Sequence, residues 1–215
     1  MIDTVTFENQ YGEKFMPYEQ YEIYMKSHSF SPPTPKIFRY ALDGMDGEID
    51  LSDWAGEVKF EPREVSISFR EMSERAYHAL VQFALGRVIK VMFSNDPDYY
   101  CYGRCTGIET DVNSRVADVD MTVTCGAYRL KRVPTIVKVN VNGTGSVVVK
   151  AKRMTATPQI TVSGDCTVTF GGETYELTEG SNTIPEIKIT DRPATMAFTA
   201  SAATTIEVKW TDGVL

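Results

Sequence analysis

YALDGMDGEIDLSDWAGEVKFEPREVSISFR, residues 40–70, is the stretch from which the fold can be inferred most directly. It opens with an acidic turn punctuated by glycine, Asp43–Gly47, and then predicts two short strands, Val58–Phe60 and Val65–Phe69. In the second strand every other residue is apolar, which predicts one buried and one solvated face. Pro62 has no backbone donor, so it suits a kink or an edge and not the middle of a sheet. The polar residues are typical of turns and edges, and we infer an architectural role.

Two further features flank this stretch. Trp54 follows the acidic turn; we interpret it as an anchor of the core, with exposed recognition of a partner as the alternative. Before the stretch, Ser31–Pro35 reads SPPTP and cannot join the interior of a sheet. It predicts a stiff exposed loop, either a plain connector or an arm that reaches a neighbouring subunit.

The rest of the chain predicts a mainly β protein with one helix. Residues 1–30 predict strand, turn and strand, with Tyr21, Ile23 and Met25 on one strand face. The helix is predicted over Glu74–Leu85, with Ser73 as its N-cap and an apolar stripe at three- and four-residue spacing. Tyr99–Thr110 and Val116–Cys125 predict a hairpin across Asp111–Ser114.

The composition changes after Arg129. Thr, Val, Gly and Asn then dominate, and helical patterns vanish. Val137–Val141 and Val147–Ala151 flank Asn142-Gly143, which predicts a hairpin turn, and short strands at regular spacing predict a β-sandwich up to Trp210. We therefore expect two domains, residues 1–132 and residues 133–215.

Composition narrows the function classes. The chain has 215 residues and is 42% hydrophobic, so it is long enough to bury a core. Its net charge of −7 argues against a surface built to hold nucleic acid. No apolar run approaches the ~18 residues of a membrane helix. The start, MIDTVTFENQ, shows no signal peptide, which predicts synthesis in a reducing cytosol.

The four cysteines predict packing and no metal site. Cys101 and Cys105 lie on one predicted strand, about 13 Å apart at ~3.3 Å per residue, too far for a disulfide or a shared metal. Cys125 and Cys166 each stand alone in an alternating run. We expect four reduced thiols buried as small hydrophobes, and neither metal nor cofactor.

The sequence contains few residues that could form a catalytic site. It has two histidines and none of the common phosphate-binding, nucleophile or zinc motifs. Asp118 and Asp120 would lie about 6.6 Å apart on one strand face, a spacing that glycoside hydrolysis tolerates but that a solvated strand also produces. Asp43, Asp46, Glu48 and Asp50 do not have the spacing of a calcium loop. We expect no enzymatic activity.

The stretch at residues 40–70 also resembles the N-terminal domain of the distal tail proteins of long-tailed, non-contractile bacteriophages. The matching positions are Tyr40, Asp43-Gly44, Asp46-Gly47, Ile49-Asp50-Leu51, Trp54, Gly56, Val58, Phe60, Arg63-Glu64, Ile67 and Phe69. The end of the chain, Ile206–Leu215, resembles the closing strand of that family. The resemblance implies an N-terminal β-sandwich or split-barrel belt domain with one helix, followed by a galectin-like β-sandwich.

The function implied by the resemblance is structural. It is a hexameric ring at the distal end of a phage or prophage tail, in the virion, after assembly in the host cytoplasm. Its partners would be the tail tube protein and baseplate, tail-tip or tail-fibre proteins. Candidate contacts with neighbours are Pro32, Pro33, Pro35, Trp54 and Arg63.

Two alternatives stay open. One is a tail tube subunit. The other is a carbohydrate-binding sandwich for host attachment, although its aromatic residues Phe170, Tyr175, Phe198 and Trp210 fall at positions that the alternation would bury. The chain has no room for an inserted carbohydrate module, which argues against direct binding to the host surface.

Overall fold

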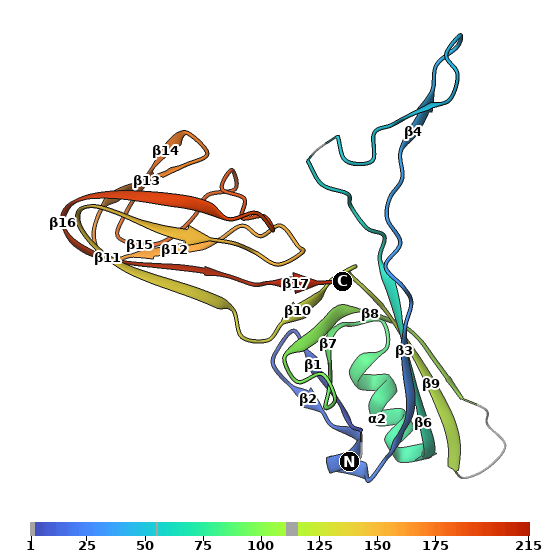
Figure 1. Cartoon of the computed structure of the whole chain (residues 1–215). Coiled ribbons are helices and arrows are strands. Elements are labelled where there is room, and N and C mark those ends of the chain that lie inside the picture. Colours follow the sequence, from blue (N-terminus) through green and yellow to red (C-terminus); the bar gives the residue numbers. More distant parts are fainter. Residues whose placement is uncertain (1–2, 55, 111–115) are drawn as a thin grey trace. The chain divides into compact units, whose positions relative to one another are not determined.

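The computed structural model describes residues 3–54, 56–110 and 116–215. The chain, drawn in Figure 1, divides into two compact units, Met1–Arg129 and Leu130–Leu215. Each unit contains its own hydrophobic core. Strands dominate both units, which confirms the predicted mainly β fold. Neither helix in the described part of the chain is long and apolar enough to cross a membrane.

The first unit contains nine strands and two helices in chain order. They are β1 (Val5–Asn9), β2 (Lys14–Phe15), α1 (Pro17–Tyr21), β3 (Met25–Phe30), β4 (Arg39–Ala41), β5 (Glu48–Asp50), β6 (Arg63–Ser73), α2 (Glu74–Ala84), β7 (Val88–Phe93), β8 (Tyr99–Thr110) and β9 (Val116–Cys125).

Seven of these strands form one antiparallel sheet in the order β2–β1–β7–β8–β9–β6–β3. The sheet curls strongly, because residues on strands far apart in this order are in contact. Phe93 on β7 stacks on His28 of β3 with ring centroids 4.3 Å apart, although three strands lie between them. Phe7 on β1 meets Phe69 on β6 edge to face at 6.4 Å. The result is a half-barrel, as the predicted split barrel requires.

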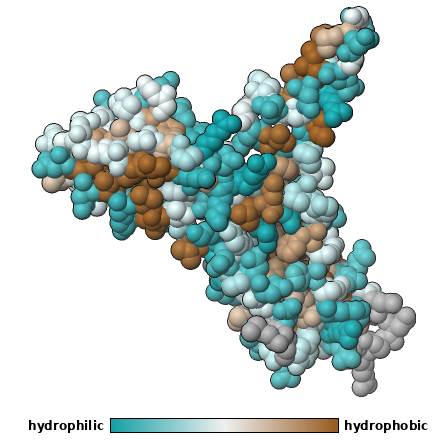
Figure 2. Space-filling model, in the orientation of Figure 1, coloured by the Kyte–Doolittle hydropathy of each residue, from teal (hydrophilic) through white to brown (hydrophobic). Residues whose placement is uncertain are grey.

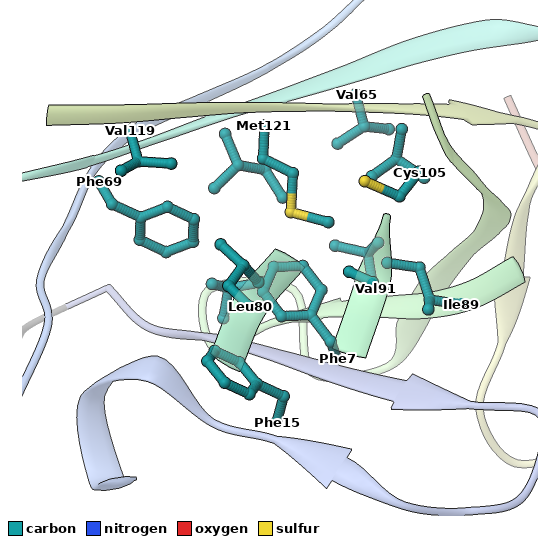
Figure 3. Close-up of a cluster of buried hydrophobic side chains, with 14 of the residues drawn as sticks. Phe7, Phe15, Val65, Phe69, Leu80, Ile89, Val91, Cys105, Val119 and Met121 are labelled. Carbon is teal, nitrogen blue, oxygen red and sulfur yellow. The ribbon is translucent and has the colours of Figure 1, made fainter. Parts of the chain in front are cut away.

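Helix α2 fills the concave side of this half-barrel. The predicted helix is confirmed, and the Ser73 side chain accepts a hydrogen bond from the Ala76 N–H as its N-cap. Ala76, Leu80 and Ala84 are completely buried on its inner face. Figure 3 shows Leu80 among Phe7, Phe69 and Met121, where the helix meets the sheet. The apolar faces of β6 and β9, which their alternation predicts to be buried, are thus covered by α2.

Leu80→Ala is expected to lower the free energy of unfolding of this unit by about 3 kcal/mol, since the side chain has no exposed surface and the cavity cannot collapse fully. Gln82→Ala, at an exposed position of the same helix, is the matched control and should change stability by less than ~0.5 kcal/mol. Urea denaturation followed by circular dichroism measures both. Equal effects of the two substitutions would contradict this packing.

The prediction for residues 1–30 is wrong in one place. Residues 17–21 form the short helix α1 and not part of a strand. Pro17 stands at the start of the helix, where its fixed φ and missing N–H are tolerated. Five residues are too few for a 3.6-residue period to be distinguished from alternation. Tyr21, the last residue of α1, stacks on Phe15 with ring centroids 5.5 Å apart.

The cysteines are buried, as predicted, but they do not all stand alone. Cys101 on β8 and Cys125 on β9 are diagonal neighbours in the sheet, because Cys125 lies opposite Gly103. The sequence separates these residues widely, and only the β8–β9 register brings them together. That register covers Gly103 to Thr110 on β8; the predicted turn at Asp111–Ser114 lies outside the described residues.

The second unit consists of strands alone. Their bounds are β10 (Arg129–Lys131), β11 (Thr135–Val149), β12 (Gln159–Val162), β13 (Cys166–Phe170), β14 (Glu173–Leu177), β15 (Gly180–Thr183), β16 (Ala194–Trp210) and β17 (Gly213–Val214).

Two long strands, β11 and β16, pair along their whole lengths and pass through both layers of this unit. The first half of β16 pairs with β13, which pairs with β14; the second half of β16 pairs with β12, which pairs with β15. The layers enclose Phe198, Ile206 and Val208, all buried. The predicted β-sandwich is confirmed.

The predicted hairpin at Asn142-Gly143 is wrong. Residues 135–149 form one continuous strand, and its register against β16 shifts between Val141 and Gly143. Gly143 has φ +85°, a conformation that suits a tight turn and a β-bulge equally. Between the pairs at Val141 and Gly143 the register advances by two residues on β11 (141 to 143) and by four on β16 (204 to 200), so the extra residues of the bulge lie on β16. Similarly, residues 194–210, where the regular spacing predicts separate short strands, form the single strand β16.

Candidate assembly surface

The segment between β3 and β6, residues 31–62, forms a two-stranded ribbon that we call the arm. Beyond the short β4–β5 ladder, backbone hydrogen bonds join its two sides at intervals: Ser31 N–H donates to the Glu64 carbonyl, Lys36 N–H to the Lys59 carbonyl at 2.7 Å, and Leu51 N–H to the Phe38 carbonyl at 2.8 Å. Figure 1 shows this ribbon continuing from β3 and β6 through β4. The acidic glycine turn predicted at Asp43–Gly47 forms its tip.

The tip depends on two glycines. Gly44 and Gly47 have φ of +84° and +91°, where a side chain would be strained. Between them and the root, β4 and β5 pair Tyr40 with Ile49 and Ala41 with Glu48. The turn predicted at Asp43–Gly47 is therefore confirmed. The strands on either side of it, β4 and β5, do not belong to a hydrophobic core.

The arm exposes eight of the fifteen large hydrophobic side chains that are exposed in the described structure. They are Ile37, Phe38, Tyr40, Leu42, Met45, Ile49, Leu51 and Trp54. Trp54 is 80% exposed, so its interpretation as a core anchor is wrong. Figure 2 shows brown, apolar surface along this ribbon. Exposed apolar groups at this density on one segment are typical of an interaction site.

The register divides the arm into an apolar and a polar face. Phe38 lies opposite Leu51, and Tyr40 lies opposite Ile49. Because side chains alternate across a strand, these four residues share one face of the ribbon. The intervening pairs, Arg39 with Asp50 and Ala41 with Glu48, occupy the other face. The ribbon is thus amphipathic, but no layer of the described chain covers its apolar face.

Ion pairs link the two strands of the arm on its polar face. Arg39 lies 3.9 Å from both Glu48 and Asp50. Asp50 also accepts the Ser52 N–H at 2.9 Å, and the hydrogen bonds from Ser52, followed by the charge of Arg39, lower the pKa of this carboxyl. These contacts hold the ribbon in register without a core, although each exposed pair contributes little on its own.

The root of the arm is anchored to the half-barrel. Arg63 is only 6% exposed; its Nη1 donates to the Ala127 carbonyl at 3.4 Å, and its guanidinium lies 5.1 Å from the centre of the Phe30 ring. Phe60 meets Tyr128 edge to face at 6.0 Å. Arg63 was predicted as a contact residue, and its burial corrects that assignment: it supports the arm from within.

The other four predicted contact residues all lie on the arm. Pro32 and Pro35 are exposed, Pro33 is half-buried, and Pro35 pairs with Phe60 in an isolated bridge. Their fixed φ stiffens the first part of the ribbon. The structure brings them onto one element with Trp54, and adds the apolar side chains of β4 and β5, which the sequence did not single out as contact residues.

The acidic residues considered for chemistry are used in surface contacts. Asp118 binds Lys26 at 3.1 Å, which is the main cause of its lowered pKa, and Asp120 accepts a hydrogen bond from Ser68. Across the described ranges, no group of three or more His, Cys, Asp or Glu side chains is placed to hold a metal ion.

The aromatic residues considered for sugar binding do not form an exposed platform. Phe198 and Trp210 are 1% and 4% exposed, while Phe170 and Tyr175 are half-buried against the core. The Tyr175 hydroxyl donates to Glu173, the main cause of the rise in its pKa to about 12.

Comparison with known proteins adds one informative likeness. No protein-family model matches the chain, and no curated protein matches it in sequence. Among solved structures, the chain is similar to the SPP1 Dit (gp 19.1) protein over 100% of both chains, with a TM-score of 0.64 and 15% identity. That protein is described as a paradigm of the hub adsorption apparatus in phages that infect Gram-positive bacteria. The predicted likeness in fold to a distal tail protein is confirmed.

Two other solved structures are only weakly similar to this chain. A designed double-stranded β-helix matches 35% of this chain and 97% of its own, with a TM-score of 0.28 and 20% identity. A conserved protein of unknown function from Pseudomonas aeruginosa PAO1 matches 97% of this chain and 98% of its own, with a TM-score of 0.29 and 11% identity.

Proposed function

We propose that the protein is a structural subunit of a bacteriophage or prophage tail, forming a ring at the distal end that joins the tail tube to the baseplate or adhesin proteins. The observation that carries this proposal is the uncovered apolar face of the arm. The likeness in fold to the SPP1 Dit protein along the whole chain supports the same role. Fold alone does not determine function, so the proposal depends on the arm having a partner.

The partner of the arm is a second copy of the chain. We place the arm of each copy against a surface of its neighbour other than the neighbour's arm. Such a head-to-tail contact repeats around a rotation axis and closes into a ring, here of six copies. Residues 1–132 form the ring, and residues 133–215 face the baseplate or adhesin proteins.

The remaining partners follow from the proposed place of the ring at the distal end of the tail. The ring contacts the tail tube protein on one side and tail-tip, tail-fibre or baseplate proteins on the other, and it resides in the virion after assembly in the host cytoplasm. Its role is structural and not catalytic. With a net charge of −7 per copy, the ring repels DNA phosphates, so the genome can pass without being held.

The test is the mass of the purified protein in solution, by mass photometry and light scattering at tens of micromolar. One chain has a mass of 24.0 kDa, so a hexamer should give six times this value. Negative-stain images should show rings with an open centre. A clean monomer would contradict the proposal, and long tubes formed by the protein alone would indicate a tail tube subunit instead.

A further inference from the structure

The second unit contains a pocket whose lining is rich in lysine. It has a volume of about 560 Å³, within the range of ~300–1,000 Å³ that is typical of small-molecule sites. Its lining comes from segments of the unit that are far apart in the sequence. The polar lining residues are Lys131, Thr135, Lys150, Lys152, Asp191 and Asp212.

Hydrogen bonds hold these segments together, so the walls of the pocket belong to the folded unit. Lys131 N–H donates to the Asp212 carbonyl at 2.8 Å, and Lys152 N–H donates to the Asp212 carboxylate at 3.0 Å. Between Lys150 and Lys152, Ala151 is 1% exposed and donates its N–H to the Thr190 carbonyl at 2.9 Å. The backbones of Lys131 and Lys152 are therefore tied to the same buried residue, which keeps both side chains at one pocket.

The three lysines of the pocket, Lys131, Lys150 and Lys152, carry positive charges without a partner. None of them takes part in an ion pair with the described residues, whereas Lys138 in the same unit pairs with Glu207 at 2.8 Å. Lys150 and Lys152 are exposed, so their ammonium groups can reach a ligand that arrives from solvent. The protein as a whole is acidic, with a net charge of −7, so three unpaired cations around one pocket form a local site of attraction for anions.

The two acidic residues of the pocket do not cancel this charge. Asp212 is 4% exposed, and its carboxylate already accepts hydrogen bonds from three groups of the unit itself. Asp191 is exposed and lies 3.9 Å from Arg153, whose charge is opposite to its own. The pocket thus presents three unpaired ammonium groups and two carboxylates that are already bound.

We propose that this pocket binds a phosphoryl group, with Lys131, Lys150 and Lys152 as its ligands. A lysine ammonium is a compact charge with three donors on a flexible stem, so three of them can surround an anion without a fixed planar geometry. A phosphate carries more charge and more acceptor oxygens than one carboxylate, so it gains most from three cations. The phosphate is either a free ion or a group carried by a larger molecule, because the volume leaves room for an attached group.

The experiment is isothermal titration calorimetry of the full-length protein with sodium phosphate, at neutral pH and constant ionic strength. We expect one site per chain with a Kd of about 1 mM, at least ~10-fold tighter than for acetate, and an affinity that falls as sodium chloride is added. Phenyl phosphate is titrated in parallel. Equal binding of phenyl phosphate would support a phosphoryl group on a larger molecule, and binding of inorganic phosphate alone would support the free ion.

Substitutions test whether the lysines make the site. Lys150→Gln and Lys152→Gln should each weaken phosphate binding about tenfold, and replacing all three lysines with glutamine should abolish it. The matched control is Lys188→Gln, which removes an exposed lysine of the same unit outside the pocket and should leave binding unchanged. Asp191→Asn removes a negative charge from the lining and should tighten binding about threefold, a gain that damage to the fold would not produce.

Three results would overturn the proposal: no binding at ~20 mM phosphate, equal affinities for phosphate and acetate, or unchanged binding in the triple-glutamine variant. Equal affinities would indicate an acidic segment of a partner protein instead. Circular dichroism and the melting temperature establish that the triple variant is folded. None of these outcomes depends on ring assembly, because the pocket lies within one unit of one chain.

Discussion

Replacing Phe38, Tyr40 and Leu51 with threonine should leave each chain folded but dissociate the oligomer at concentrations where the unsubstituted protein remains assembled. These side chains lie on the uncovered apolar face of the arm. Threonine keeps the preference for extended backbone, so the ribbon itself should persist. Truncating a buried interface side chain weakens binding by about 1–2 kcal/mol, so three substitutions should lower the affinity roughly 10²- to 10⁴-fold.

Sedimentation velocity over a concentration series measures this change. The matched control replaces Arg39 and Glu48 with threonine on the polar face of the same ribbon, where the ion pair of 3.9 Å is exposed and contributes little. The control should sediment like the original protein. The unfolding transition of the first unit should not change in either variant, because no arm side chain enters its core. If the triple-threonine variant and the control assemble equally well, the arm is not the contact.

The sequence predicted the parts of the fold that are set by local periodicity. Alternation in β6 and β9 and the three-to-four spacing in α2 are each visible within a dozen residues, and the structure packs these faces against one another. At the arm, the wrong prediction is that Trp54 anchors a core, and alternation could not have corrected it. Alternation shows that Phe38 and Tyr40 share a face, but it carries no information about whether that face is covered by the same chain.

Features that depend on contacts between residues far apart in the sequence could not be predicted from local periodicity. A glycine at position 143 is compatible with both a hairpin turn and a β-bulge. Only the register of β11 against β16 distinguishes the two. The placement of Cys101 and Cys125 as diagonal neighbours depends on the pairing of β8 with β9. For the candidate site, the prolines and Trp54 are predicted contacts singled out from the local sequence, whereas the burial of Arg63 follows from its tertiary contacts with Phe30 and Ala127.

The second large effect is expected in the C-terminal unit, at Asp212. This carboxylate is 4% exposed and accepts three hydrogen bonds: from the Thr135 hydroxyl at 2.5 Å, the Lys152 N–H at 3.0 Å and Trp210 Nε1 at 3.1 Å. It therefore joins the start of β11, the segment after β11 and the end of β16. Asp212→Ala leaves three donors without an acceptor, and we expect it to lower the free energy of unfolding by about 3–5 kcal/mol. Asp212→Asn keeps one acceptor oxygen and should lose about half as much.

Trp210 provides the measurement, because the chain has only two tryptophans and Trp54 can be replaced by phenylalanine in every variant. Urea unfolding followed by Trp210 fluorescence then reports on the C-terminal unit alone. The matched control is Asp191→Ala, which also removes a carboxylate but breaks only a half-exposed pair with Arg153 at 3.9 Å; it should change stability by less than ~0.5 kcal/mol. An effect of Asp212→Ala below ~1 kcal/mol would show that these three hydrogen bonds do not hold the end of the chain in place, and that the closing of this sandwich depends on its apolar core instead.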